Sequence, residues 1–150
     1  MDRREFALGA GALVVGSAVS GGALAYDGAI SSRARSIHRR ATVVDANLGP
    51  PLTSDQLPLP QATLDLARNA GVSAIKTSMG GFNAPFEDTL AEIAFYQRLI
   101  EAHPDYFRQI RNAGDIAAAK RARQVGIIFS FESAACLEDK VDRIDLFRNL

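Results

Sequence analysis

From residue 31 onward, short apolar runs alternate with longer stretches in which apolar and polar positions recur at helical spacing. Three apolar runs rich in β-branched residues predict strands at residues 42–44, 72–81 and 126–134. In the third, the run Ile127-Ile128-Phe129 is continuous rather than alternating, which is typical of a strand buried on both faces.

Helical patterns lie between these runs. A short basic helix is expected over residues 31–40, and a second helix from about Thr63 until Gly71 ends it. A longer helix is expected from Phe86 to Ala102, with an apolar stripe formed by Phe86, Leu90, Ile93, Ala94 and Ile100.

The last third of the chain continues this pattern. Residues 105–114 predict helix or turn, and Asp115 is a candidate N-cap for the helix that follows. Residues 139–150 predict a final helix with Val141 and Ile144 on one side.

The order strand, helix, strand, helix, strand, helix indicates an α/β fold with parallel strands and crossover helices. An open three-stranded sheet is possible, but two helices fall between residues 85 and 125 and little could cover the far side of such a sheet. We therefore interpret residues 26–150 as part of a (β/α)8 TIM barrel, its first three strand–helix units. The chain then ends inside the last helix, as a truncated barrel would.

The first 25 residues have the pattern of an export signal. Arg3-Arg4 precede a weakly apolar stretch that ends in Ala23-Leu24-Ala25, an A-x-A cleavage pattern, and twin arginines resemble the twin-arginine signal of bacteria. We expect an exported protein, periplasmic or membrane-associated, that engages the twin-arginine export machinery. The alternative is an uncleaved N-terminal anchor.

Charge and cysteine content exclude several classes of function. The 17 basic and 17 acidic residues balance, so no electrostatic footprint for nucleic acid is present. The single cysteine, Cys136, rules out an internal disulfide framework and is interpreted as a small buried hydrophobe. No P-loop, dinucleotide-binding fingerprint or paired-cysteine metal site occurs.

Candidate chemistry lies where strands end, because parallel α/β folds place reactive groups at the carboxyl ends of their strands. Three places qualify: Asp45 with Asn47, the turn at residues 78–81, and Glu132 with Ser133. Glu132 is the sharpest candidate, since a carboxylate directly after an apolar strand has to be solvated, hydrogen-bonded or bound to a cation. A solvated strand end is the alternative for Glu132, and Asp and Asn also favour turns by bonding their own backbone.

Other polar residues carry weaker signals. Lys76 lies within the second strand, and Ser78 has no nearby base in sequence. His38 stands among arginines, which favours a surface histidine, and His103 precedes a proline at a helix end, where a structural role is more common than a catalytic one.

Three stretches together resemble a known family: VVDANLGPP, AHPDYFRQIRNAGDIAAAKRARQVGIIFSFES and DKVDRIDLFRNL. They are similar to the membrane dipeptidase (renal dipeptidase) family of zinc metallopeptidases, over most of residues 26–150. The resemblance implies a barrel of the metal-dependent hydrolase type with two zinc ions that activate a water to cleave dipeptides.

The first metal-binding motif departs from the family pattern. The resemblance implies Asp-Gly-His-Asn-Asp at the end of the first strand, where the histidine and the last aspartate bind metal. Here Asn47 stands in the histidine position and Gly49 in the aspartate position, while Glu132 matches the glutamate that bridges the metals. A neutral amide is a poor zinc ligand beside imidazole. The family's two remaining histidine ligands come from later strands.

Three functions therefore stay open. The first is an exported zinc dipeptidase that hydrolyses small peptides by metal-assisted chemistry. The second is a non-catalytic binding protein on the same barrel that has lost its metal centre. The third is a hydrolase with an altered single-metal site that uses Glu132.

Overall fold

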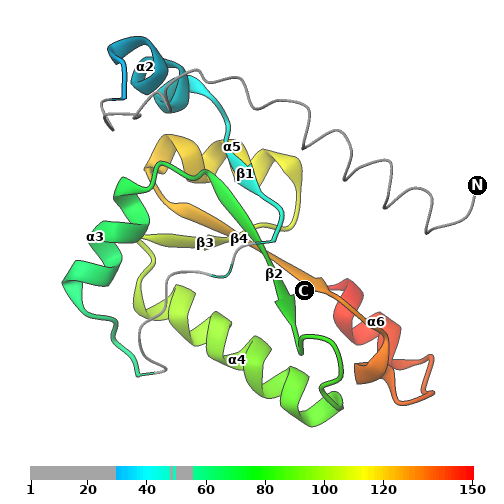
Figure 1. Cartoon of the computed structure of the whole chain (residues 1–150). Helices are drawn as coiled ribbons and strands as arrows, with labels where there is room; N and C mark the ends of the chain where they lie inside the picture. Colours follow the sequence, from blue (N-terminus) through cyan, green and yellow to red (C-terminus); the bar gives the residue numbers. More distant parts are fainter. Residues whose placement is uncertain (1–29, 48, 50–55) are drawn as a thin grey trace, which may run out of the picture. The chain divides into compact units, whose positions relative to one another are not determined.

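The computed structural model of the protein describes residues 30–47, 49 and 56–150 (Figure 1). Its helices are α2 (Ser32–Arg40), α3 (Gln61–Asn69), α4 (Phe86–Ala102), α5 (Ala113–Ala122), the 3-10 helix η1 (Ala135–Leu137) and α6 (Arg143–Arg148). Its strands are β1 (Val44–Asp45), β2 (Ala74–Met79), β3 (Phe107–Gln109) and β4 (Val125–Phe131). All of these elements lie in the unit formed by Ser32–Leu150. Within the described ranges, no helix has the length and apolar character needed to cross a bilayer.

The four strands form one parallel sheet in the order β1-β2-β4-β3. The chain advances across the sheet from β1 through β2 to β3 and then returns to β4. Right-handed crossovers place α3 and α4 on one face for the advance and α5 on the other face for the return. Figure 1 shows α4 and α5 on opposite sides of β3 and β4.

Two apolar cores match this arrangement. The larger core joins α3 and α4 to the sheet and contains Ile75, Met79, Leu99, Phe107 and Ile127, each at most 2% exposed. The smaller core lies under α5 and joins Ala74, Ile110 and Ala119. The sequence led us to expect that little could cover the far side of an open sheet. That expectation was wrong, because α5 covers part of it.

Strand β3 is the element that the sequence pattern did not predict, since residues 105–114 were expected to form helix or turn. It has only three residues, and two of them, Arg108 and Gln109, are polar. Pairing with Val125–Ile127 and burial of Phe107 create the strand, and both are tertiary effects. The parallel sheet therefore has four strands instead of the expected three.

Helix α4 has the predicted bounds, but its buried stripe is shifted along the helix. The buried side chains are Thr89, Ile93, Tyr96 and Leu99, whereas Leu90 is 38% exposed. Thr89 can be fully buried because its hydroxyl donates to the Pro85 carbonyl, 2.9 Å away. A polar residue thus occupies a core position that the apolar pattern assigned to a neighbour.

The beginning of α5 also differs from the prediction. Asn112, not Asp115, is the N-cap residue. Its Oδ1 accepts from the Asp115 backbone N at 3.2 Å, and Asp115 Oδ2 accepts from the Asn112 backbone N at 3.1 Å. Asp115 belongs to the same capping box, three residues further on.

The final helix is shorter than predicted. Glu138 and Asp139 have left-handed backbone torsions, with φ of 47° and 59°, so no helix can run through them. Helix α6 therefore begins only at Arg143, and the expected apolar side is exposed: Val141 by 73% and Ile144 by 46%.

Candidate functional site

The carboxyl-terminal halves of β2 and β4 carry polar residues on the face opposite α4. In β2, Ile75 and Met79 belong to the core beneath α4, so Lys76 and Ser78 alternate onto the other face. Ser78 pairs with Ser130 of β4. Helix α5 packs near the amino-terminal half of β4, so this part of the face is only partly buried.

Ser130 is the member of this face that sequence reasoning missed. Its Oγ donates to the main-chain carbonyl of Thr77 at 2.9 Å, which ties β4 to β2. Counting back by two from Glu132 would have found it, because alternate residues of a strand share a face.

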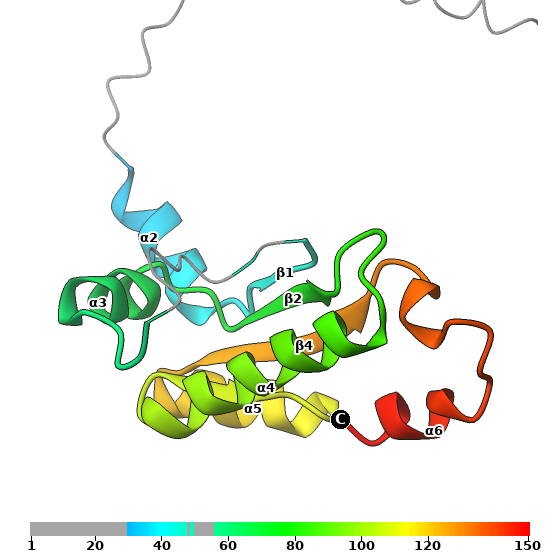
Figure 2. The same cartoon turned by 90° about the horizontal axis from the view of Figure 1, so that it is seen from below.

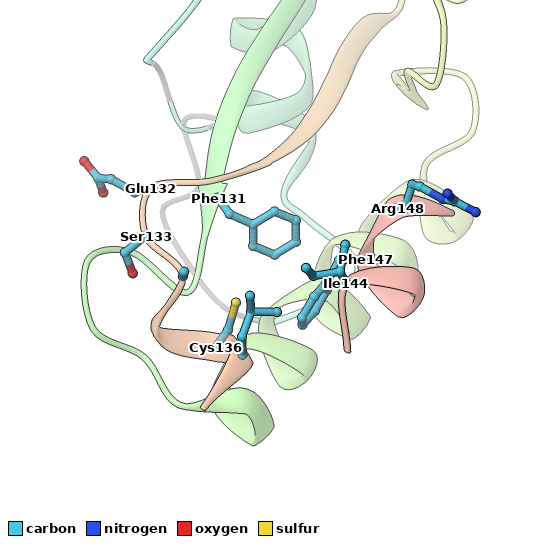
Figure 3. A pocket seen from close by; sticks show the side chains of 9 residues that line it. Phe131, Glu132, Ser133, Cys136, Ile144, Phe147 and Arg148 are labelled. Carbon is cyan, nitrogen blue, oxygen red and sulfur yellow. The ribbon is translucent and has the colours of Figure 1, made fainter. Parts of the chain in front are cut away.

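Glu132 follows the last residue of β4 and is exposed. Figure 3 shows its carboxylate pointing away from the ring of the preceding residue, Phe131. Glu132 makes no hydrogen bond or ion pair with any residue in the described part of the chain. The carboxylate is therefore accessible to solvent, to a substrate or to a cation.

Asp45 and Asn47 form a local turn at the end of β1. Asp45 Oδ1 accepts a hydrogen bond from the Asn47 backbone N at 3.0 Å. This is the backbone-bonding role that the residue types already suggested. Asn47 and Gly49 are both exposed, and a Cβ added at Gly49 would meet no atom within 4 Å.

The strand register separates Asp45 from Glu132. Asp45 pairs with Ile75, and Ile75 pairs with Ile127, five residues before Glu132. At the rise of a β-strand, five residues correspond to about 16 Å along the strand direction. Among the residues that the structure describes, no three His, Cys, Asp or Glu side chains form a group that could hold a metal ion.

The turn after β2 is fixed by a carboxylate that the sequence did not single out. Gly80 and Gly81 have φ of 74° and 50°, as the predicted glycine turn requires. Glu92 of α4 accepts a hydrogen bond from the Gly80 backbone N at 2.6 Å. This carboxylate holds the turn, so its role is positional.

An apolar cavity of about 520 Å³ lies beside the end of β4 (Figure 3). Phe131, Cys136, Ile144 and Phe147 line it, and the rings of Phe131 and Phe147 are 4.8 Å apart. Cys136 is buried and has no disulfide partner among the described residues, in agreement with its interpretation as a small hydrophobe. Ser133 Oγ accepts from the Ala135 backbone N at 3.2 Å, so it shapes the loop into η1.

An ion pair joins the segment after η1 to the start of α6. Glu138 Oε2 lies 2.7 Å from Arg143 Nη1, and Glu138 Oε1 accepts from the Phe86 backbone N at 3.0 Å. These hydrogen bonds, first that of Arg143 and then that of Phe86, lower the pKa of Glu138 from its ordinary value. The Arg143 guanidinium also lies 3.9 Å from the centre of the Phe86 ring, so the pair fastens α6 to the start of α4.

The two histidines lie apart from the polar face. His103 is 8% exposed, and its Nε2 accepts from the Leu59 backbone N at 2.8 Å, which is a structural role. His38 is exposed on α2. Neither histidine supplies a ligand next to Glu132.

The comparisons with known proteins give a structural likeness. No family model and no curated protein matches the sequence. Among solved structures, the chain is similar to an amidohydrolase from Pseudomonas aeruginosa, with a TM-score of 0.63 and 20% sequence identity. The match covers 77% of this chain and 33% of that one, so the chain spans about a third of the length of that structure. At this identity the likeness shows the fold: a parallel α/β arrangement of the kind found in an amidohydrolase.

Proposed function

We propose that this chain is part of an exported hydrolase of the dipeptidase type, built on a (β/α)8 barrel and acting on an amide bond of a small peptide. Two features support the barrel. Strands β1, β2 and β4 lie side by side in chain order, and α3 and α4 cover the same face, as successive units of a barrel do. Strand β3 is then an addition at the edge.

Glu132 carries the functional part of this proposal. A free carboxylate stands at the carboxyl end of a parallel strand, beside the face that bears Lys76, Ser78 and Ser130. In barrels of this kind, chemistry takes place at this end of the strands. A carboxylate here can accept a proton from an attacking water, orient the peptide amine or contact a cation.

The described residues do not fit a zinc site by themselves. A catalytic zinc site needs three protein ligands. Asn47 offers only a neutral amide, Gly49 only backbone, and the Asp45 carboxylate accepts the Asn47 backbone N–H. Glu132 is the residue that we propose to contact zinc, and the other ligands would have to come from outside the described part of the chain.

Metal content and dipeptide hydrolysis of the full-length protein test this proposal. Glu132→Gln removes the charge with little change in shape, so both zinc content and hydrolysis should fall. Glu101→Gln is the matched control. Glu101 is an exposed glutamate in the last turn of α4, and it makes no hydrogen bond to a described residue. The proposal fails if Glu132→Gln leaves both quantities equal to those of the control.

A second function, a peptide-binding protein without a metal centre, is favoured by Asn47 and Gly49. They stand in the two metal-binding positions of the family motif and supply neither an imidazole nor a carboxylate, which a binding protein tolerates and a two-metal site does not. Calorimetry would then show a dipeptide that binds and is recovered intact. Asn47→His with Gly49→Asp should raise zinc stoichiometry only if the remaining ligands are present, so the two functions give different results in this variant.

A further inference from the structure

A second cavity of about 520 Å³ lies at the amino-terminal end of the sheet. Residues that precede β2 and begin β4 line it together with α2 and the ends of α3 and α5. In Figure 2, α2 and α3 lie at this end of the strands and α6 at the other. The seven residues of β4 separate the two ends by about 20 Å, so a ligand here would not touch Glu132.

Positive charge dominates the wall of this cavity. Its lining includes Arg39, Arg68, Lys120, Arg123 and His38, and no Asp or Glu is among the described residues that line it. Balanced net charge over the whole chain therefore hides a local excess of cations. Clustered cations that lack counter-ions attract an anion.

The negative ends of the helix dipoles offset only part of this positive charge. The cations lie in the last turns or at the carboxyl caps of α2, α3 and α5, where basic side chains offset the partial negative charge of the helix end. Each helix end carries about half a negative charge, so three ends offset fewer than half of the four Arg and Lys charges. The positive charge that remains would be neutralised by a bound anion.

Two of the cations are held in place and two are free to bind. Arg68 Nη2 donates to the Asp105 carbonyl at 2.7 Å, and its guanidinium lies 3.8 Å from the centre of the Tyr106 ring. Lys120 Nζ donates to the Ala41 carbonyl. The exposed side chains of Arg39 and Arg123 make no hydrogen bond or ion pair with residues in the described ranges.

We propose that this cavity binds a phosphoryl group, carried by a small molecule for which the volume leaves room. Guanidinium groups pair with phosphate oxygens through two parallel hydrogen bonds, and a dianion satisfies more of the excess charge than a single carboxylate does. Fixed cations at Arg68 and Lys120 lower the ordering cost of binding, and the free arginines close on the ligand.

Binding of inorganic phosphate to the full-length protein, measured by calorimetry at constant ionic strength, tests the site. Arg39→Gln with Arg123→Gln should weaken phosphate binding about tenfold or more, because each change removes a charge-assisted hydrogen bond. The control pair is Arg98→Gln with Arg121→Gln, which removes the same charge from exposed arginines that do not line the cavity. Arg39→Gln alone, on the exposed face of α2, should give a smaller loss and guards against misfolding of the double variant.

Three results would overturn the site. The first is a wild-type protein that shows no phosphate binding above that of chloride. Equal weakening in both double variants would mean that the general field of the protein binds the ion. Succinate that binds as tightly as phosphate would remove the selectivity for a phosphoryl group.

Discussion

Glu92 Oε2 lies 2.6 Å from the backbone N of Gly80, so a helix carboxylate holds the turn that ends strand β2. The turn needs this support because Gly80 has a φ of 74° and sits directly over α4. A Cβ at Gly80 would clash with Thr89 Oγ1. Close packing of this turn on α4 sets the carboxyl end of β2, the strand that carries Ser78 on the polar face.

Gly80→Ala should lower the free energy of unfolding by about 2 kcal/mol or more, because it adds left-handed strain and a clash with Thr89. Gly81→Ala is the matched control: its φ is 50°, but an added Cβ meets nothing within 4 Å, so it should lose only about 1 kcal/mol. Urea unfolding measures both. Equal losses would show that the turn does not pack on Thr89.

Glu92→Ala should lower the free energy of unfolding by about 1.5 to 3 kcal/mol, since it leaves the Gly80 N–H without its charged acceptor. Glu92→Gln keeps an acceptor oxygen, so its free energy of unfolding should fall by less than that of Glu92→Ala. Chemical denaturation compares the two, with Glu101→Ala as a control at the exposed end of the same helix. If both Glu92 variants match the control, the hydrogen bond contributes nothing to stability.

His103→Leu should lower stability by about 1 to 3 kcal/mol, because the Leu59 backbone N–H loses its acceptor in a buried place. His38→Leu changes the other histidine, which is exposed on α2, and should have little effect. Thermal unfolding of the two variants checks this. Similar melting temperatures would contradict a structural role for His103.

Tyr96 should make stability fall at alkaline pH. Burial raises the pKa of its phenol above the ordinary 10.0; the hydrogen bond with the Thr77 hydroxyl at 3.4 Å lowers this pKa by less, and the nearby Glu92 charge raises it by the smallest amount. The folded state therefore holds the proton more tightly than the unfolded chain. This contribution is fully present below pH 10.0 and is lost as pH rises through the folded-state pKa.

Tyr96→Phe removes this dependence, so the variant should lose less stability than the wild type above pH 10.0. Urea unfolding of both proteins at a series of alkaline pH values measures the difference. Parallel curves would show that Tyr96 does not titrate differently in the two states.

Export is predicted from residues 1–25, which lie outside the described part of the chain. Arg3-Arg4 and the Ala23-Leu24-Ala25 pattern predict cleavage before Tyr26. N-terminal sequencing of the periplasmic protein should begin at Tyr26, and Arg3→Lys with Arg4→Lys should retain the protein in the cytoplasm. An intact Met1 on exported protein would contradict cleavage.

The sequence alone determined the parallel α/β class, the bounds of α4 and the interpretation of Cys136. These depend on local signals: apolar runs of strand length, helical spacing, and residue types that favour burial or a turn. The turn at Asp45 and Asn47 also follows from local chemistry, since the carboxylate reaches its own backbone two residues on. Glu132 could be named as a candidate because its position after an apolar strand is local.

Only the tertiary structure decided the rest. Phe107–Gln109 becomes a strand because it pairs with residues 18 positions later, and that pairing sets the strand order. The distance between Asp45 and Glu132 depends on register, which is fixed by contacts among three strands. Arg39, Arg68 and Arg123 are far apart in sequence, and only the converging helix ends bring their charges to one cavity. A sequence pattern records which face a residue takes, whereas its neighbours across strands and helices are fixed by packing of the whole chain.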